Sequence, residues 1–181
     1  MSESIVLPKN ERIKVGLMGF GKTGKAVAAV LLNDKSVDLV WVVRKSHKLE
    51  HRSVPEFLGI ESDEDGIIHS SSEISAPELL ERYPVDAIVD FSSQDGLDYY
   101  GKTAAERGIS IVSAISNYPD SRHKELWSYS RTTRVLWSPN ITVGINFMIL
   151  AARTLQKIAP YADLQIIEEH FKAKLETSEP L

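Results

Sequence analysis

Cysteine is absent from the 181 residues of this chain. Its absence excludes a disulfide framework, a thiolate metal site and a cysteine nucleophile. Long apolar runs are missing as well, so no segment is long enough to span a bilayer. Residues 1–12 are polar and match neither a signal peptide nor a membrane anchor. We therefore expect a soluble, cytoplasmic protein with no membrane partner.

Basic residues are also fewer than acidic ones. The chain carries 21 Lys and Arg against 25 Asp and Glu, for a net charge of −4. Because binding to nucleic-acid phosphates needs a basic face, we expect no nucleic-acid partner. His47 and His51 are four residues apart but lack an evident third ligand, so we predict no metal site. The length suits one domain, or one domain plus part of another.

The feature that stands out is a glycine-rich turn between a strand and a helix. Residues 13–18 form a mostly apolar run typical of a buried strand, and residues 25–32 are helix-forming. Between them Gly19 permits a tight turn, Gly21 lets a pyrophosphate approach the backbone, and Gly24 allows close packing of helix on strand. The alternative is an ordinary glycine turn. The residues predicted to bind the phosphates are Gly19, Phe20, Gly21, Lys22, Thr23 and Gly24.

Strand and helix patterns alternate along the rest of the first 138 residues. Strands are predicted at residues 37–43, 66–69, 85–91, 109–115 and 135–138. Helices are predicted after an N-cap at Ser75, over residues 95–107, and from a cap at Asp120 or Ser121 to residue 131. Residues 50–65 are predicted to be loop with at most a short turn of helix. This alternation predicts an α/β fold, a Rossmann-type doubly wound parallel sheet.

Ligands of such sheets bind outside the carboxyl ends of the strands. The residues at these ends that we predict to contact a cofactor are Arg44, Lys45, Phe91, Ser92, Ser93, Ala114, Ser116, Asn140 and Thr142. An NAD site usually has an acid at the end of the second strand, where this chain has Arg44 and Lys45. Cations there suit a 2′-phosphate, so the pattern favours NADPH, with NADH still possible. The alternative is a solvated charge run.

The pattern changes after residue 138. A turn-rich connection leads into an apolar helix over residues 145–158, and residues 164–171 are predicted to form a strand. One helix and one strand do not make a stable domain. We therefore divide the chain into a dinucleotide-binding domain, residues 1–138, and the start of a smaller α+β domain, residues 139–181, which either continues further or pairs with another chain.

Four blocks of the sequence resemble the dihydrodipicolinate reductase family of bacterial lysine and diaminopimelate synthesis. They lie at residues 14–24, 89–92, 139–146 and 166–174, in the family's order and near its spacing. The resemblance implies an NAD(P)H-dependent oxidoreductase that reduces 4-hydroxy-tetrahydrodipicolinate or dihydrodipicolinate. It further implies a small dicarboxylate substrate and a homo-oligomer, either a dimer or a tetramer.

The last block carries the catalytic residues that the resemblance implies. The family has a Glu-x-His-His-x-x-Lys signature there, whose first His is the proposed general acid and whose Lys helps to hold the substrate. His170 and Lys174 occupy these positions, and Phe171 replaces the second His. A histidine with an ordinary pKa of about 6.5 can donate a proton near neutrality. From the residues alone, a half-buried strand histidine and a solvated lysine remain the alternatives.

The sequence departs from the family in two further places. The family's Gly-Thr-Thr-Gly beside the nicotinamide is represented by residues 113–116. Its carboxylate-gripping loop is represented at most by Thr177 and Ser178, which lie between two glutamates. We therefore expect a chain that is truncated within the substrate domain, binds reduced cofactor and turns over substrate slowly or not at all. A catalytically impaired relative and an oligomerising interaction protein that uses the fold without cofactor remain open.

Overall fold

A computed structural model describes residues 7–49, 51–163, 165 and 167. Its centre is a six-stranded sheet with the order β3-β2-β1-β4-β5-β6, in which neighbouring strands run parallel. The strands are β1 (Ile13–Met18), β2 (Val37–Arg44), β3 (Ile67–Ser70), β4 (Ala87–Asp90), β5 (Ser110–Ser113) and β6 (Val135–Trp137). The helices are the 3-10 turn η1 (Lys9–Glu11), α1 (Lys22–Asn33), α2 (Val54–Leu58), α3 (Ala76–Arg82), α4 (Gly96–Glu106), α5 (Asp120–Tyr129) and α6 (Val143–Ile158).

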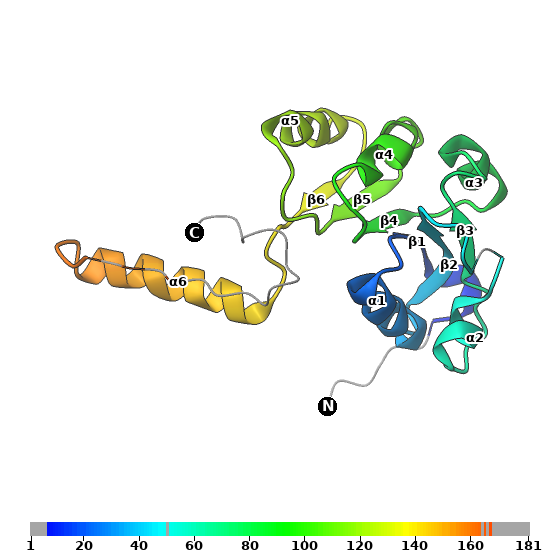
Figure 1. Cartoon of the computed structure of the whole chain (residues 1–181), viewed down its shortest axis with the longest axis horizontal. Coiled ribbons are helices and arrows are strands. Elements are labelled where there is room, and N and C mark those ends of the chain that lie inside the picture. The colour runs from blue at the N-terminus through cyan, green and yellow to red at the C-terminus, as the bar shows by residue number, and fades with distance from the viewer. Residues whose placement is uncertain (1–6, 50, 164, 166, 168–181) are drawn as a thin grey trace.

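Helices cover both faces of the sheet. Figure 1 shows α1 and α2 on one face and α3, α4 and α5 on the other. The strand order reverses between β1 and β4, where the chain crosses from one half of the sheet to the other. This arrangement confirms the predicted α/β, Rossmann-type doubly wound sheet.

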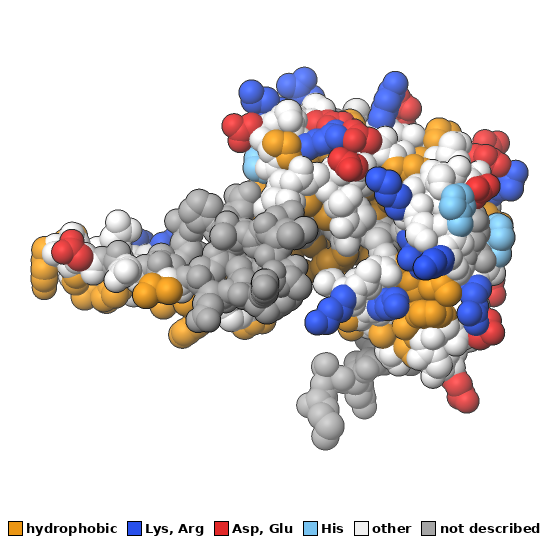
Figure 2. Space-filling model, viewed as in Figure 1, with side chains coloured by type: hydrophobic (Ala, Val, Ile, Leu, Met, Phe, Trp, Pro, Cys, Tyr) orange, Lys and Arg blue, Asp and Glu red, His pale blue; other side chains and the backbone are white. Residues whose placement is uncertain are grey.

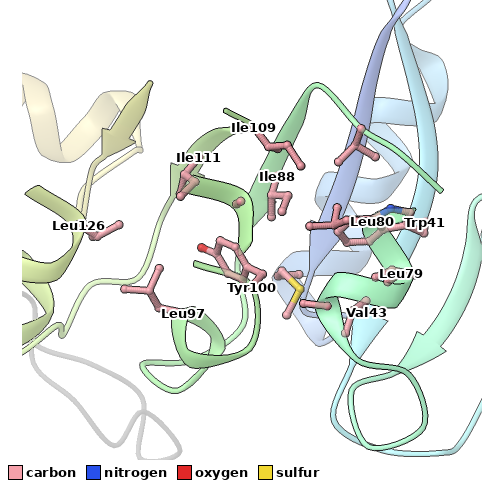
Figure 3. Packing of buried hydrophobic residues seen from close by; sticks show 14 of the residues in the cluster. Trp41, Val43, Leu79, Leu80, Ile88, Leu97, Tyr100, Ile109, Ile111 and Leu126 are labelled. Atoms are coloured by element: carbon pink, nitrogen blue, oxygen red, sulfur yellow. The ribbon is translucent and has the colours of Figure 1, made fainter. Parts of the chain in front are cut away.

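The two faces of the sheet have separate hydrophobic cores. Successive residues of a strand point to opposite faces, so Leu17 packs with α1 and α2 while Met18 packs with α3 and α4. Figure 3 shows the second core, in which Tyr100 of α4 lies among Leu97 and the isoleucines of β4 and β5. Because both faces are buried, the strands read as nearly continuous apolar runs.

A glycine in β1 matches a large side chain in β2. A Cβ at Gly16 would collide with the ring of Trp41, and the register between the two strands shifts at this point. Val15 pairs with Leu39 and Gly16 with Trp41, which leaves Val40 as the extra residue of a bulge. The N–H of Leu39, next to the bulge, donates to the buried carboxylate of Glu64 at 2.8 Å.

Most predicted elements are present, with shifted ends. The first helix begins at Lys22 rather than at residue 25. Ser75 caps α3 as predicted, because its hydroxyl accepts the N–H of Glu78 at 3.4 Å. The predicted cap of α5 was wrong: its N-cap is Pro119, which makes no side-chain hydrogen bond, and Asp120 is already the first helical residue. The strand predicted at residues 164–171 lies outside the described residues apart from two isolated positions.

The last described helix, α6, contacts little of the rest of the described residues. It has no buried residue, and Figure 1 shows it extending away from the sheet. Its apolar residues include Val143, Phe147 and Leu150, which are 87%, 68% and 63% exposed. Figure 2 shows such side chains along its lower edge. Within the described part of the chain, no helix combines the length and apolar character needed to cross a membrane.

Candidate dinucleotide site

The glycine turn after β1 is held by close backbone contacts. The N–H of Gly19 donates to the carbonyl of Val43 at 2.8 Å, and the φ of Gly19 is +95°. A Cβ at Gly19 would lie 2.6 Å from the carbonyl oxygen of Phe91. One at Gly24 would collide with the carbonyl of Gly19. Both positions therefore require glycine for the turn and the helix to pack on the sheet.

Gly21 has a different role. Its φ of −78° suits any residue, and a Cβ there would meet no atom within 4 Å. It is the N-cap of α1, whose first intrahelical bond runs from the N–H of Lys25 to the carbonyl of Gly21 at 3.0 Å. The preceding N–H groups of the first turn lack intrahelical partners, and that turn carries two lysines and no acid. This helix end is suited to an anion.

A pocket of about 390 Å³ opens in front of this turn. On one side it reaches the ends of β2 and β3, where Arg44 and Lys45 line it. One guanidinium nitrogen of Arg44 donates to the carbonyl of Lys48 at 3.0 Å, which ties the side chain to the following loop. The N–H of Ser71 donates to the carbonyl of Arg44 at 2.9 Å. Two cations thus stand at the end of β2, where an NAD site would have an acid.

A second pocket, of about 430 Å³, lies at the ends of β4 and β5. Thr23 of α1 lines one side of it, and the loop that follows β5 lines the other, including Ala114 and Ser116. Both pockets share Ser92, Ser93 and Asp95 as a common wall. The two hollows therefore flank the turn after β4, at the point where the strand order reverses. Doubly wound sheets bind dinucleotides across this crevice.

The shared turn is anchored by a buried carboxylate. Asp90, the last residue of β4, is fully buried. Its Oδ1 accepts the N–H of Ser92 at 2.8 Å and the hydroxyl of Ser92 at 2.6 Å, and its Oδ2 accepts the hydroxyl of Tyr100 at 2.9 Å. Burial raises the pKa of Asp90, while the hydrogen bonds from Ser92, Tyr100 and Tyr118 act in the opposite direction.

The two pockets collect most of the residues predicted to bind cofactor. Those that line one or both are Gly19, Phe20, Gly21, Thr23, Arg44, Lys45, Phe91, Ser92, Ser93, Ala114 and Ser116. Gly24 is packed beneath the turn and Lys22 begins α1. Asn140 and Thr142 are not brought to these pockets: they lie in the connection after β6, where the Asn140 carbonyl accepts the side-chain amide of Asn146 at 2.7 Å. His170, Lys174, Thr177 and Ser178 lie outside the described residues.

Sequence reasoning missed several pocket residues. Ser71 follows β3 and could have been found from the rule that ligands bind beyond strand ends. Ser46, Asp95 and Tyr99 line the first pocket, and Gln94 lines the second. Tyr99 had no signal in the sequence, because only the packing of α4 against the turn brings it there.

The residues present fit a nicotinamide dinucleotide. The Cβ position of Gly21 is open and lies at the N-terminus of α1. A pyrophosphate there would accept hydrogen bonds from the unpaired N–H groups of the helix. The pocket with Arg44 and Lys45 then suits the adenosine half, and the pocket beyond Ser93 suits the nicotinamide half. Among the described residues no group of three or more His, Cys, Asp or Glu side chains is placed to hold a metal ion.

Comparison with known proteins agrees with this geometry. Residues 13–141 match the family model described as dihydrodipicolinate reductase, N-terminus. A 4-hydroxy-tetrahydrodipicolinate reductase of Nitratidesulfovibrio vulgaris is 24% identical over 155 residues, which are 85% of this chain and 55% of that protein. One of Methanothermobacter thermautotrophicus is 26% identical over 166 residues, 90% of this chain and 60% of that protein. The chain thus spans little more than half the length of these curated relatives.

A solved structure has the same fold. Dipicolinate-bound dihydrodipicolinate reductase from Paenisporosarcina sp. TG-14 superimposes with a TM-score of 0.60 at 14% identity, over 80% of this chain and 54% of that one. At such an identity the likeness concerns the fold alone. The family model, by contrast, covers well over half of the chain, from β1 through the end of β6. This chain therefore belongs to the dihydrodipicolinate reductase family, of which it contains the N-terminal, Rossmann-type region.

Proposed function

We propose that this chain binds a reduced nicotinamide dinucleotide and provides the cofactor half of a reductase. The observation that supports this most directly is the pair of pockets on either side of the Ser92–Ser93 turn, in front of a glycine turn and a free helix end. The first turn of α1 would bind the pyrophosphate, and the walls of the two pockets would orient the two nucleosides. When bound, the cofactor supplies a hydride. A cytoplasmic location, expected from the sequence, is part of the same proposal.

The finer proposal is that NADPH is preferred over NADH. Arg44 and Lys45 line the pocket together with the hydroxyl residues Ser46 and Ser71, and no acid stands at the end of β2. Two cations favour a 2′-phosphate through charge-assisted hydrogen bonds. A ribose without that phosphate would gain nothing from them.

Titration of both cofactors tests this proposal. We expect wild-type protein to bind NADPH more tightly than NADH, and the double change Arg44→Ala/Lys45→Ala to weaken NADPH binding by about tenfold to a hundredfold. NADH binding should change little. Lys102→Ala, which removes an exposed lysine of α4 that lines neither pocket, is the matched control. Equal wild-type affinities for the two cofactors would contradict the preference, and no binding of either would contradict the proposed function.

We further propose that the protein acts on the small dicarboxylate substrate of its family, 4-hydroxy-tetrahydrodipicolinate or dihydrodipicolinate. The proposal rests on family membership and on His170 and Lys174 at the positions of the family's acid and substrate-binding lysine. Thr177 and Ser178 are proposed substrate contacts. General acid catalysis contributes typically 10²- to 10⁴-fold. Where the wild-type chain has measurable turnover of fresh substrate, His170→Ala should therefore reduce it by about that factor and leave the dissociation constant of NADPH unchanged. Equal turnover by this variant and the wild type would exclude His170 as the acid.

Self-association through residues 139–181 is the third proposal. The division at residue 138 places α6 in this part, and its apolar side chains are exposed along its length. An apolar surface of this kind marks an interaction site. We propose that a second copy of the chain covers it, to give a dimer or a tetramer, as the family resemblance implies.

A further inference from the structure

Asp90 is an unusual residue to find at the centre of a protein fold. It is fully buried, and no Lys, Arg or His lies within ion-pair distance of it in the part of the chain that the structure describes. A buried carboxylate without a cation is held only by its hydrogen bonds and costs folding free energy. An asparagine could not reproduce these contacts, because both carboxylate oxygens accept hydrogen bonds and an amide has only one acceptor atom. The charge therefore points to a role beyond stability.

The hydrogen bonds of Asp90 converge on the turn that divides the two pockets. Ser92 donates both its N–H and its hydroxyl to one carboxylate oxygen, at 2.8 and 2.6 Å. On the other side of this turn lies Gly96, where a Cβ would collide with the Ser92 hydroxyl and lie 3.2 Å from Oδ2 of Asp90. The turn is therefore clamped between its own carboxylate and the first residue of α4, with no space for a larger residue at Gly96.

Two tyrosines continue the hydrogen-bond network of Asp90 away from the pockets. Tyr100 donates to Asp90 at 2.9 Å, is 1% exposed and lines neither pocket. Figure 3 shows it deep in the core between α4 and the sheet. Burial keeps the pKa of Tyr100 well above its usual value, so the hydroxyl stays a donor. The hydroxyl of Ser113 donates to Tyr118 at 3.1 Å, which leaves the Tyr118 hydroxyl hydrogen free to be donated to Asp90.

We propose that Asp90 and Tyr100 are positioning residues for the dinucleotide, because they hold the Ser92–Ser93 turn in the place where the cofactor must cross from one pocket to the other. The inference rests on the proposed function. Neither residue needs to touch the cofactor, since Ser92 and Ser93 form the shared wall. A loosened turn would open into the crevice and compete with the bound molecule.

The test compares two variants that each remove one tyrosine hydroxyl from a carboxylate. Tyr100→Phe breaks the bond to Asp90. Tyr129→Phe breaks a similar bond, from the Tyr129 hydroxyl to Glu125 at 2.7 Å, and touches neither pocket. Two quantities are measured on the full chain: amide hydrogen exchange of Ser92 and Ser93 without cofactor, and the dissociation constant of NADPH. Asp90→Asn is measured alongside, in case one variant fails to fold.

We expect Tyr100→Phe to speed exchange at Ser92 at least about tenfold and to raise the dissociation constant of NADPH roughly three- to tenfold. Tyr129→Phe should leave both within about twofold of wild type. If Tyr100→Phe sped exchange at Ser92 without changing the dissociation constant of NADPH, the network would have only a structural role and the proposal would be overturned. Weaker NADPH binding with unchanged exchange would also overturn it. If the wild-type chain bound neither cofactor, the proposed function itself would fail, which is a different result from one confined to the variants.

Discussion

At the scale of single residues, a substitution at Gly21 should affect cofactor binding without affecting folding. Its backbone conformation suits any residue and its Cβ position is open, so Gly21→Val should fold normally. The valine would fill the space proposed for the pyrophosphate and shield the N–H groups of α1. We expect NADPH and NADH affinity to fall by at least about a hundredfold, from the loss of several charge-assisted hydrogen bonds, with the melting temperature unchanged. Isothermal titration and thermal unfolding measure the two effects.

Other glycines serve as controls for that experiment. Gly24→Ala places a Cβ against the carbonyl of Gly19, so it should destabilise the fold by about 1–3 kcal/mol. Gly144→Ala adds a methyl group in open space on α6, away from the pockets, and should change neither stability nor binding appreciably. Retained cofactor affinity in Gly21→Val would show that the phosphates lie elsewhere.

The burial of Asp90 leads to a prediction about how the free energy of unfolding depends on pH. Its folded pKa is raised by burial, so the folded state holds this proton more tightly than the unfolded state does. The stabilising contribution of the protonated form is fully present below the unfolded pKa and is lost as pH rises through the folded pKa. Asp90→Asn removes the titration. The free energy of unfolding of this variant, minus that of the wild type, should therefore become more positive from acid to neutral pH.

Urea unfolding at a series of pH values measures this difference. Subtracting the wild-type curve removes the contribution of carboxylates common to both proteins, such as Glu64, whose pKa is also raised by burial. A difference that stayed constant across the acid range would mean that Asp90 titrates alike in the folded and unfolded states.

At the scale of elements, helix caps give a matched pair of predictions. Ser75 accepts the N–H of Glu78 at the start of α3, so Ser75→Ala should lower the free energy of unfolding by about 1 kcal/mol. Ser121 lies inside α5 and is not its cap, so Ser121→Ala should have almost no effect. Chemical denaturation of both variants tests the assignment. A similar loss in both would place a cap at Ser121 after all.

At the scale of the whole molecule, α6 is the element through which we propose that copies of the chain associate. If a second copy covers its apolar face, Phe147→Glu should place a charge in that interface and shift the assembly to monomer, because a buried unpaired charge is strongly unfavourable. Gln156→Glu, which adds the same charge at an exposed polar position of α6, is the control. Sedimentation velocity over a range of concentrations distinguishes the species. A wild-type chain that remained monomeric at every concentration would contradict self-association.

The sequence by itself determined the elements and the kind of ligand site. The apolar runs are continuous because both faces of the sheet are buried. The glycine spacing can be read because Gly19 and Gly24 each meet a local steric requirement, while Gly21 leaves space for a ligand. Capping was read correctly at Ser75, where a side chain reaches its own helix, and wrongly at α5. There a proline occupies the N-cap, and the first turn proceeds without any side-chain hydrogen bond.

Only the tertiary structure decided which of these parts meet. The order of strands brings β1 beside β4, and this places the Ser92–Ser93 turn against Gly19 although the two are some seventy residues apart along the chain. Tyr99 joins the first pocket because α4 packs against this turn, and Asn140 and Thr142 line neither pocket. The Asp90 network was invisible in the sequence, because a carboxylate reveals that it is buried and clamped only when α4 packs over it. Local chemistry can be read along a chain, but contacts between distant segments depend on how the whole sheet buries its two faces.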